Sequence, residues 1–293
     1  MSKFLIRLTV FLVVVAAAGY FLFPFVNDQI LQYRNAAQIR DYRQRAEALS
    51  RTENEAILSE GIEYNGQISS ITLRDMFSDR TVSAADTSQG ILRVSGSPMI
   101  GVVEIPARGI ALPIYPEEDE NALDTGVMHV QGTSFPTGAG GQTVLAGLSG
   151  RSADGIWGDL GLTQADLLKP LGRAQEGVLV FLEALNRIWL YQVTDITTIE
   201  ANQLNAQYFP LNRDQLTLIS NPGGRRLIVR AQRLTEEEAA AALRKNETLN
   251  KLPEWANVMI IGSPVLLAGL VIMWIVERFK NRRYRLPKRS QTV

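Results

Sequence analysis

The chain has 293 residues, enough for one large domain or two small ones, and its 30 Lys and Arg balance 30 Asp and Glu. This balance gives no sign of a nucleic-acid partner. There is no cysteine and only one histidine, which excludes disulfides, thiolate metal sites and thiol catalysis and argues against zinc. We therefore expect neither a metal nor a cofactor.

Two apolar stretches predict membrane spans. Leu8 to Val26 is uncharged, follows Lys3 and Arg7, and is about as long as a helix that crosses a bilayer. Because no small-residue cleavage site clearly follows it, we interpret it as an uncleaved signal anchor rather than a removed signal peptide. The second span, from about Trp255 to Val276, precedes a dense basic tail, which argues against a buried core helix. Positive charge stays cytoplasmic, so both termini should be cytoplasmic, with the domain between the spans outside the plasma membrane.

The segment from Asn27 to about Ser59 predicts one long amphipathic helix, or two, packed on the domain through one stripe. A coiled-coil stalk is the weaker alternative, because the stripe is irregular and rich in alanine. Its members are Ile30, Tyr33, Ala37, Tyr42, Ala46 and Leu49. Gly61 to Pro98 is turn-rich, which predicts an extended, loosely held segment.

From Gly101 onwards, short apolar runs are separated by Gly and Pro, a pattern typical of a closed or nearly closed, antiparallel-rich β-barrel. Pro222-Gly223-Gly224 between the last two runs is a turn signal, since proline fixes φ and glycine adopts positive φ. One helix should begin at Thr163, and the capping-box pattern at 235–238 should open an Ala-rich helix that leads back to the membrane. The expected strands are 101–106, 110–115, 142–146, 178–182, 188–193, 216–219 and 227–230.

Several segments resemble, in matching order, those of a class C (pilin-polymerising) sortase. The family patterns are G-x-I-E-I-P, L-P-I-Y, G-x-G-H-x-x-G-T-S-x-P, T-V-L-T-G, F-x-D-L and R-L-L-V-R. The matching stretches here are Gly101–Pro106, Leu112–Tyr115, Gly126–Pro136, Thr143–Gly147, Ile156–Leu160 and Arg226–Arg230. The two predicted spans on either side of one exported domain also fit that class. The resemblance implies a mainly β, sortase-like closed barrel with short helices, in a Gram-positive cell envelope.

This resemblance and the spans together give an expected organisation. The parts are a cytoplasmic N-terminus with its anchor (1–26), a helical region with a lid-like segment (27–100), a sortase-like barrel (101–234), a helical linker (235–254), a transmembrane helix (255–276) and a basic cytoplasmic tail (277–293).

The family's covalent catalysis uses a cysteine thiolate, a histidine and an arginine. The resemblance places the histidine position at Leu148 and the arginine position at Arg226. The cysteine position is Asn221 if the strand is aligned without gaps, and Ser220 if Pro222 is aligned with the family's proline. We prefer Asn221, because strand register decides which face a side chain points to. The catalytic pair is therefore absent.

Arg226 is the one catalytic position that keeps its residue. We expect it to bind a peptide carbonyl or carboxylate, and the alternative is a solvated basic strand end shared with Arg225 and Arg230. Asp75-Met76-Phe77 resembles the Asp-Pro-Phe or Asp-Pro-Trp lid of class C sortases, with Met76 in place of proline.

These residues lead us to expect a membrane-anchored but catalytically inactive sortase-like protein. It would act in surface-protein or pilus assembly by binding a sorting-signal peptide or an active sortase. One alternative is a divergent transpeptidase or hydrolase that uses Ser220, but a hydroxyl needs a general base. The sole histidine, His129, lies at a different family position, where we expect a hydrogen-bonded structural role. The other alternative is an envelope protein that uses the barrel only as a scaffold.

Overall fold

The computed structural model describes residues 32–73, 75–77, 90–116, 122–149, 168–211 and 213–249. They divide into two compact units, the first ending at Thr235 and the second beginning at Glu236. Within these ranges, no helix combines the length and apolar character needed to cross a bilayer. Both predicted spans, the basic tail and the helix expected at Thr163 lie outside the described residues. The membrane topology therefore stays a prediction.

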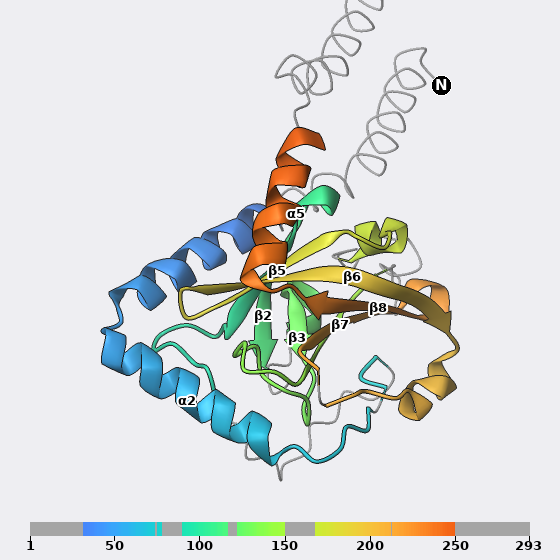
Figure 1. The fold of residues 1–293 in the computed structure, drawn as a ribbon. Helices are drawn as coiled ribbons and strands as arrows, with labels where there is room; N and C mark the ends of the chain where they lie inside the picture. Colours follow the sequence, from blue (N-terminus) through green and yellow to red (C-terminus); the bar gives the residue numbers. More distant parts are fainter. Residues whose placement is uncertain are drawn as a thin grey trace, which may run out of the picture. The chain divides into compact units, whose positions relative to one another are not determined.

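A closed β-barrel forms the body of the first unit, as expected (Figure 1). Its strand order is β1-β2-β3-β4-β7-β8-β6-β5, and β5 pairs with β1 to complete the circle. The pairing is antiparallel except at β2–β3 and β4–β7, which are parallel. The strands are β1 Gly101–Ile105, β2 Ile110–Pro116, β3 Val127–His129, β4 Gln142–Gly147, β5 Leu179–Ala184, β6 Arg187–Ile199, β7 Gln215–Ser220 and β8 Arg226–Arg233.

All the predicted strands are present, but β3 was not among them. A strand of three residues is too short to show the alternation by which strands are recognised. The short helices between strands are η1 Pro106–Arg108, α3 Ala122–Thr125, η2 Lys169–Arg173, η3 Ala201–Ala206 and η4 Pro222–Gly224.

Two turns fix the register of the strands that they join. Leu185 and Asn186, with φ of 50° and 61°, form a two-residue turn between β5 and β6, so Ala184 pairs with Arg187. Positive φ at both central residues matches the right-handed twist of paired strands. Gly223 and Gly224, with φ of 57° and 82°, connect β7 to β8, as the Pro-Gly-Gly signal predicted.

Two helices precede the barrel and lie along its outside (Figure 1). The first covers residues 32–48, and the second, α2 (Arg51–Gln67), begins at Ser50, whose side chain forms a capping box with Glu53. The buried stripe of the first helix is Asn35, Ile39, Tyr42 and Ala46.

This stripe corrects the predicted one in two places. Tyr33 is 72% exposed, and Ala37 is also exposed. Each lies two residues from Asn35, and two residues correspond to about 200° around a helix. Both side chains therefore point away from the buried face. The prediction failed because it followed apolar side chains, whereas the buried stripe begins with an asparagine.

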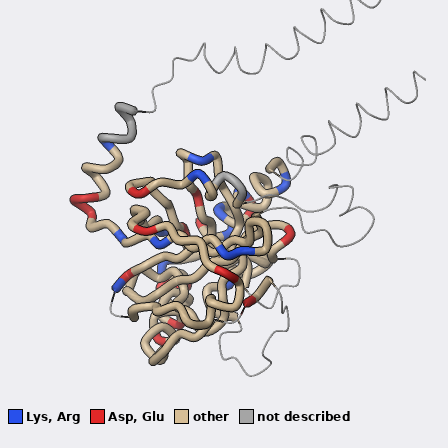
Figure 2. Tube along the Cα trace, turned by 90° about the vertical axis from the view of Figure 1, so that its right-hand side faces the viewer, with Lys and Arg blue, Asp and Glu red and all other residues tan. Residues whose placement is uncertain are grey.

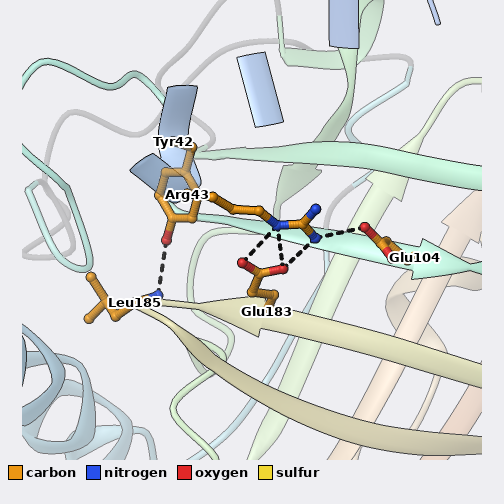
Figure 3. Close-up of polar contacts among 5 residues, drawn as sticks. All are labelled: Tyr42, Arg43, Glu104, Glu183 and Leu185. Carbon is orange, nitrogen blue, oxygen red and sulfur yellow. Dashed lines mark hydrogen bonds and ion pairs between the residues drawn. The ribbon is translucent and has the colours of Figure 1, made fainter. Parts of the chain in front are cut away.

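A polar cluster attaches the first helix to the barrel (Figure 3). The Tyr42 hydroxyl donates to the Ile100 carbonyl (3.2 Å) and accepts from the Leu185 N–H (3.1 Å). Arg43 Nε donates to both Glu183 oxygens (3.0 and 2.9 Å), and Arg43 Nη2 donates to Glu104 (2.8 Å). Burial raises the pKa of Tyr42 to about 12, and the hydrogen bond to Glu183 raises the pKa of Arg43.

The prediction of a loosely held segment from Gly61 to Pro98 is wrong for the described residues. Gly61 belongs to α2, where an added Cβ would lie 2.9 Å from Thr137 Cγ2, so this glycine permits close packing rather than a turn. Asn65 Nδ2 donates to the Phe135 carbonyl (3.0 Å), and the Phe135 N–H donates to Asn65 Oδ1 (2.7 Å). Further along, Leu73 and Leu92 are fully buried in the core.

In the second unit, the described part is α5 (Glu236–Leu249), which begins at the predicted capping-box pattern. Three glutamates fill its first turn, where the helix dipole favours negative charge. Figure 2 shows acidic and basic residues interspersed along the described trace.

Candidate functional site

The parallel pairing of β4 with β7 brings two predicted site positions together. The pairs run from Gln142 with Gln215 to Gly147 with Ser220, so Leu148 and Asn221 follow side by side at the carboxyl ends of the two strands. A hydrogen bond from the Ser149 N–H to Asn221 Oδ1 (2.9 Å) joins the two chain segments there.

The antiparallel pairing of β7 with β8 brings in the third position. The last pair is Ser220 with Leu227, so the register places Asn221 opposite Arg226 across the turn. Leu148, Asn221 and Arg226 therefore occupy neighbouring positions on three adjacent strands, in the order β4, β7, β8.

The register also tells on which face of the barrel wall each side chain lies. Arg230 pairs with Thr217, and its guanidinium reaches the half-exposed Asp195 (2.6 Å), so this face is the outer one. Arg226 is four residues before Arg230 and shares its face, because side chains alternate along a strand. Ser220 is three residues after Thr217 and points to the inner face.

Ser220 is correspondingly buried, with 0% exposure, and its Oγ has no hydrogen-bond partner among the described residues. A hydroxyl that faces the interior of the barrel is out of reach of a peptide on the outer face. Asn221, one residue later, faces the side on which Arg226 lies.

The guanidinium of Arg226 is 4% exposed and is held by two sets of acceptors. Its Nη1 donates to the carbonyls of Gly224 and Arg225 (both 3.0 Å) in the β7–β8 turn. Its other edge donates to Asp75, from Nε to Oδ1 (2.8 Å) and from Nη2 to Oδ2 (2.6 Å). Arg226 is thus a buried, bidentate partner of a carboxylate and not a solvated strand end.

The segment Asp75-Met76-Phe77 covers Arg226. The Phe77 ring lies over the guanidinium, with 4.9 Å from Arg226 Cζ to the ring centroid. Met76, the residue in the place of the lid proline, is 1% exposed and belongs to the apolar core. Asp75 and Phe77, from a distant part of the sequence, therefore contact the predicted site.

His129 lies away from this group. It pairs with Leu145 of β4, so β4 separates it from β7. Its Nε2 is 3.0 Å from the Ser134 carbonyl and 3.3 Å from Thr133 Oγ1, and its ring stacks on Phe135 at 4.2 Å. This is the hydrogen-bonded structural role that the sequence suggested.

The contact between the β4 end and Asn221 was not predicted. The Ser149 N–H binds Asn221, but a backbone donor leaves no signal in the residue type, so the sequence could not have revealed it. The described residues contain no cluster of three or more acidic or histidine side chains that could hold a metal ion.

A model of the sortase domain matches residues 103–234. The chain therefore contains a sortase domain. Streptococcus pneumoniae sortase C is 24% identical, with a TM-score of 0.58 over 67% of this chain and 96% of that one.

Two further sortase structures give similar scores. Streptococcus agalactiae sortase C1 is 27% identical, with a TM-score of 0.56 over 71% of this chain and 99% of its own. Sortase A from Corynebacterium diphtheriae is 22% identical, with a TM-score of 0.55 over 70% and 95%. No curated protein sequence matches the chain. The domain match and the structural similarity together describe a sortase-fold protein related to the pilin sortases.

Proposed function

We propose that this protein is a membrane-anchored sortase without catalytic activity. It acts in surface-protein or pilus assembly by binding a sorting-signal peptide or an active sortase. The observation that carries the proposal is the juxtaposition of Leu148, Asn221 and Arg226 on β4, β7 and β8 in a chain that has no cysteine.

The chemistry of these side chains supports a loss of activity. Leucine has no group that takes or gives a proton, and the carboxamide of asparagine is neither a base nor a usable nucleophile. Covalent transfer needs a nucleophile and a base that act as a unit. Loss of both therefore removes nearly all the rate acceleration that either one provides. Arg226 alone can bind and orient a ligand but cannot cleave a peptide bond.

The structure also weakens the alternative of a serine enzyme. Ser220 faces inward and is fully buried. The only histidine in the sequence, His129, lies on β3 and is engaged there by Thr133 and Ser134. No described residue brings an imidazole to Ser220.

The partner and the location are inferred from relatives and from the sequence. Streptococcus pneumoniae sortase C has a specificity for pilin substrates, and another similar structure is sortase C1 of a pilus island. A pilin or another surface protein is the corresponding partner here. The apolar stretches 8–26 and 255–276 would anchor the chain, with the barrel on the cell-wall side.

The test uses the full-length chain, purified in detergent, and a fluorescent sorting-signal peptide. We expect saturable binding by anisotropy, no acyl adduct in intact-protein mass spectra and no transpeptidation. An adduct or turnover by the natural chain would overturn the proposal of inactivity. Absence of binding to both the peptide and an active sortase would favour a purely structural role.

A matched pair of variants tests the positions. Leu148→His with Asn221→Cys restores the catalytic pair at the neighbouring outer positions, and we expect it to form a thioester with the peptide. Leu148→His with Ser220→Cys places the sulfur on the inner face, and we expect no adduct. The reverse result would show that Ser220 stands at the nucleophile position.

A further inference from the structure

The first helix (residues 32–48) turns a basic face away from the barrel. Its opposite face is fixed, because the stripe from Asn35 to Ala46 is buried and the side chains of Tyr42 and Arg43 point toward the strands (Figure 3). The exposed side chains from residue 32 to residue 40 are Gln32, Tyr33, Arg34, Ala36, Ala37 and Arg40. Two of them are basic, one is aromatic and none is acidic.

These two arginines have no acidic partner. Neither Arg34 nor Arg40 forms an ion pair with any residue that the structure describes, and Asp41, the nearest acid on the helix, is bound by Arg45 (2.7 Å). Tyr33 is 72% exposed. Tyrosine is enriched where a bilayer meets water, and arginine binds phosphate groups through paired hydrogen bonds. This combination of side chains therefore matches an anionic membrane surface.

The sequence brings this face close to a bilayer. Tyr33 is the seventh residue after Val26, where the predicted span 8–26 ends. Even a fully extended chain places the two residues no more than about 25 Å apart. Arg40 follows about two helical turns after Tyr33, which is about 10 Å along the helix axis. The basic face is therefore within reach of the headgroups at the end of that span.

The first helix contacts the barrel at the end opposite to the candidate site. The Tyr115 hydroxyl, at the end of β2, donates to Gln38 Oε1 (2.8 Å). Tyr42 is bonded just before β1 and in the β5–β6 turn. Strand pairing places these points at the same end of the barrel as the starts of β4 and β7, whereas the candidate site follows the ends of those two strands.

Resting on the proposed membrane anchor, we propose that the outward face of the first helix binds anionic phospholipid headgroups. Tyr33 places its ring at the boundary between lipid and water, and Arg34 and Arg40 bind the phosphates. The contact holds one end of the barrel against the bilayer. The candidate site, at the other end, then faces away from the membrane, toward the side from which a partner protein would approach.

The test uses the absence of cysteine from the natural chain, so that Ala37→Cys introduces a single thiol on the outward face. The full-length variant is labelled there with a fluorophore and reconstituted at one copy per nanodisc. The discs carry a headgroup nitroxide quencher and contain either phosphatidylcholine alone or added phosphatidylglycerol. Each arginine near an anionic surface favours contact by about fivefold, so we expect a ratio of quenched to unquenched label roughly thirtyfold higher with phosphatidylglycerol.

Two controls make the result specific. Arg34→Gln with Arg40→Gln, added to Ala37→Cys, should lower the quenching to the level of phosphatidylcholine discs, and 0.5 M salt should weaken it in the natural background as screening requires. Asn202→Cys, at an exposed position in η3 after the end of β6, should not be quenched in either disc. Both labelled positions are exposed, so the variants should fold and melt as the natural chain does.

An anchored chain whose label at position 37 is not quenched, or is quenched equally in both discs, would overturn this inference and leave the proposed function intact. A label shielded from iodide in the water but not quenched by the headgroups would mean that protein covers the face instead of lipid. Quenching at position 202 as strong as at position 37 would refute the orientation of the barrel. If the chain did not enter the discs at all, the membrane anchor of the proposed function would fall, and this inference with it.

Discussion

The ion cluster of Arg43 with Glu104 and Glu183 should be the main polar attachment of the first helix, and its contribution can be predicted. Arg43→Met keeps part of the aliphatic side chain but removes the guanidinium. Glu183 lies on β5 and Glu104 on β1, on the same face of neighbouring strands. The variant therefore loses charge-assisted bonds and leaves two carboxylates near each other without a cation.

The exposure of the side chains sets the size of the effect. Glu183 is 10% exposed, but Arg43 is 38% and Glu104 31% exposed. Breaking a fully buried pair costs about 3–5 kcal/mol, and an exposed pair contributes about 0–1 kcal/mol. For this half-buried cluster we expect a loss of about 2 kcal/mol. In a unit of this size, that corresponds to a fall in Tm of about 4–8 °C.

The assay is urea unfolding followed by tryptophan fluorescence, for Arg43→Met, Glu183→Gln and the double variant. We expect a coupling energy of about 1–2 kcal/mol between the two sites. Arg45→Met, which removes an exposed i,i+4 pair with Asp41 on the same helix, is the control and should leave the midpoint unchanged. Additive effects of Arg43→Met and Glu183→Gln would refute the reasoning, because they would mean that Arg43 contributes packing alone.

Three other substitutions have expected results. Ser220→Ala removes a buried hydroxyl without a described partner and should raise the unfolding free energy by about 1 kcal/mol in urea. Tyr42→Phe should lower stability. Because the pKa of Tyr42 is about 12 in the folded protein and 10.0 ordinarily, the advantage of the natural chain is full below pH 10.0 and should shrink as the pH rises toward 12 in urea melts. Asn65→Ala leaves the Phe135 backbone groups without their partner, so it should cost about 1–3 kcal/mol and speed hydrogen exchange in residues 61–77.

All the strands except β3 were predictable, because they are runs of β-forming residues and several of them are bounded by glycine or proline. Where the prediction failed, tertiary packing decided the outcome. Gly61 looks like a turn signal in the sequence, but in the structure it is the point where α2 approaches Thr137. Tyr33 looks like a core residue but lies on the far side of its helix from Asn35.

The positions of the site residues could be predicted from the sequence, but the contacts of their side chains could not. Aligning Leu148, Asn221 and Arg226 with family motifs named three positions that the strand pairing brings together. The contact of Asp75 with Arg226 joins residues 151 positions apart, and no local pattern encodes such a pair. The family lid suggested the segment, but only the folded chain shows which atoms it binds.

The long distance in sequence between Asp75 and Arg226 also decides when their contact can form during synthesis of the chain. During synthesis Asp75 emerges long before β8, so for most of translation its carboxylate has no Arg226 to bind. The ion pair forms only after the last strand joins the barrel, and contacts between such remote residues form late and slowly. In a nascent or C-terminally truncated chain, the Asp75 carboxylate would therefore lack its Arg226 partner. Formation of this ion pair accompanies the completion of the fold.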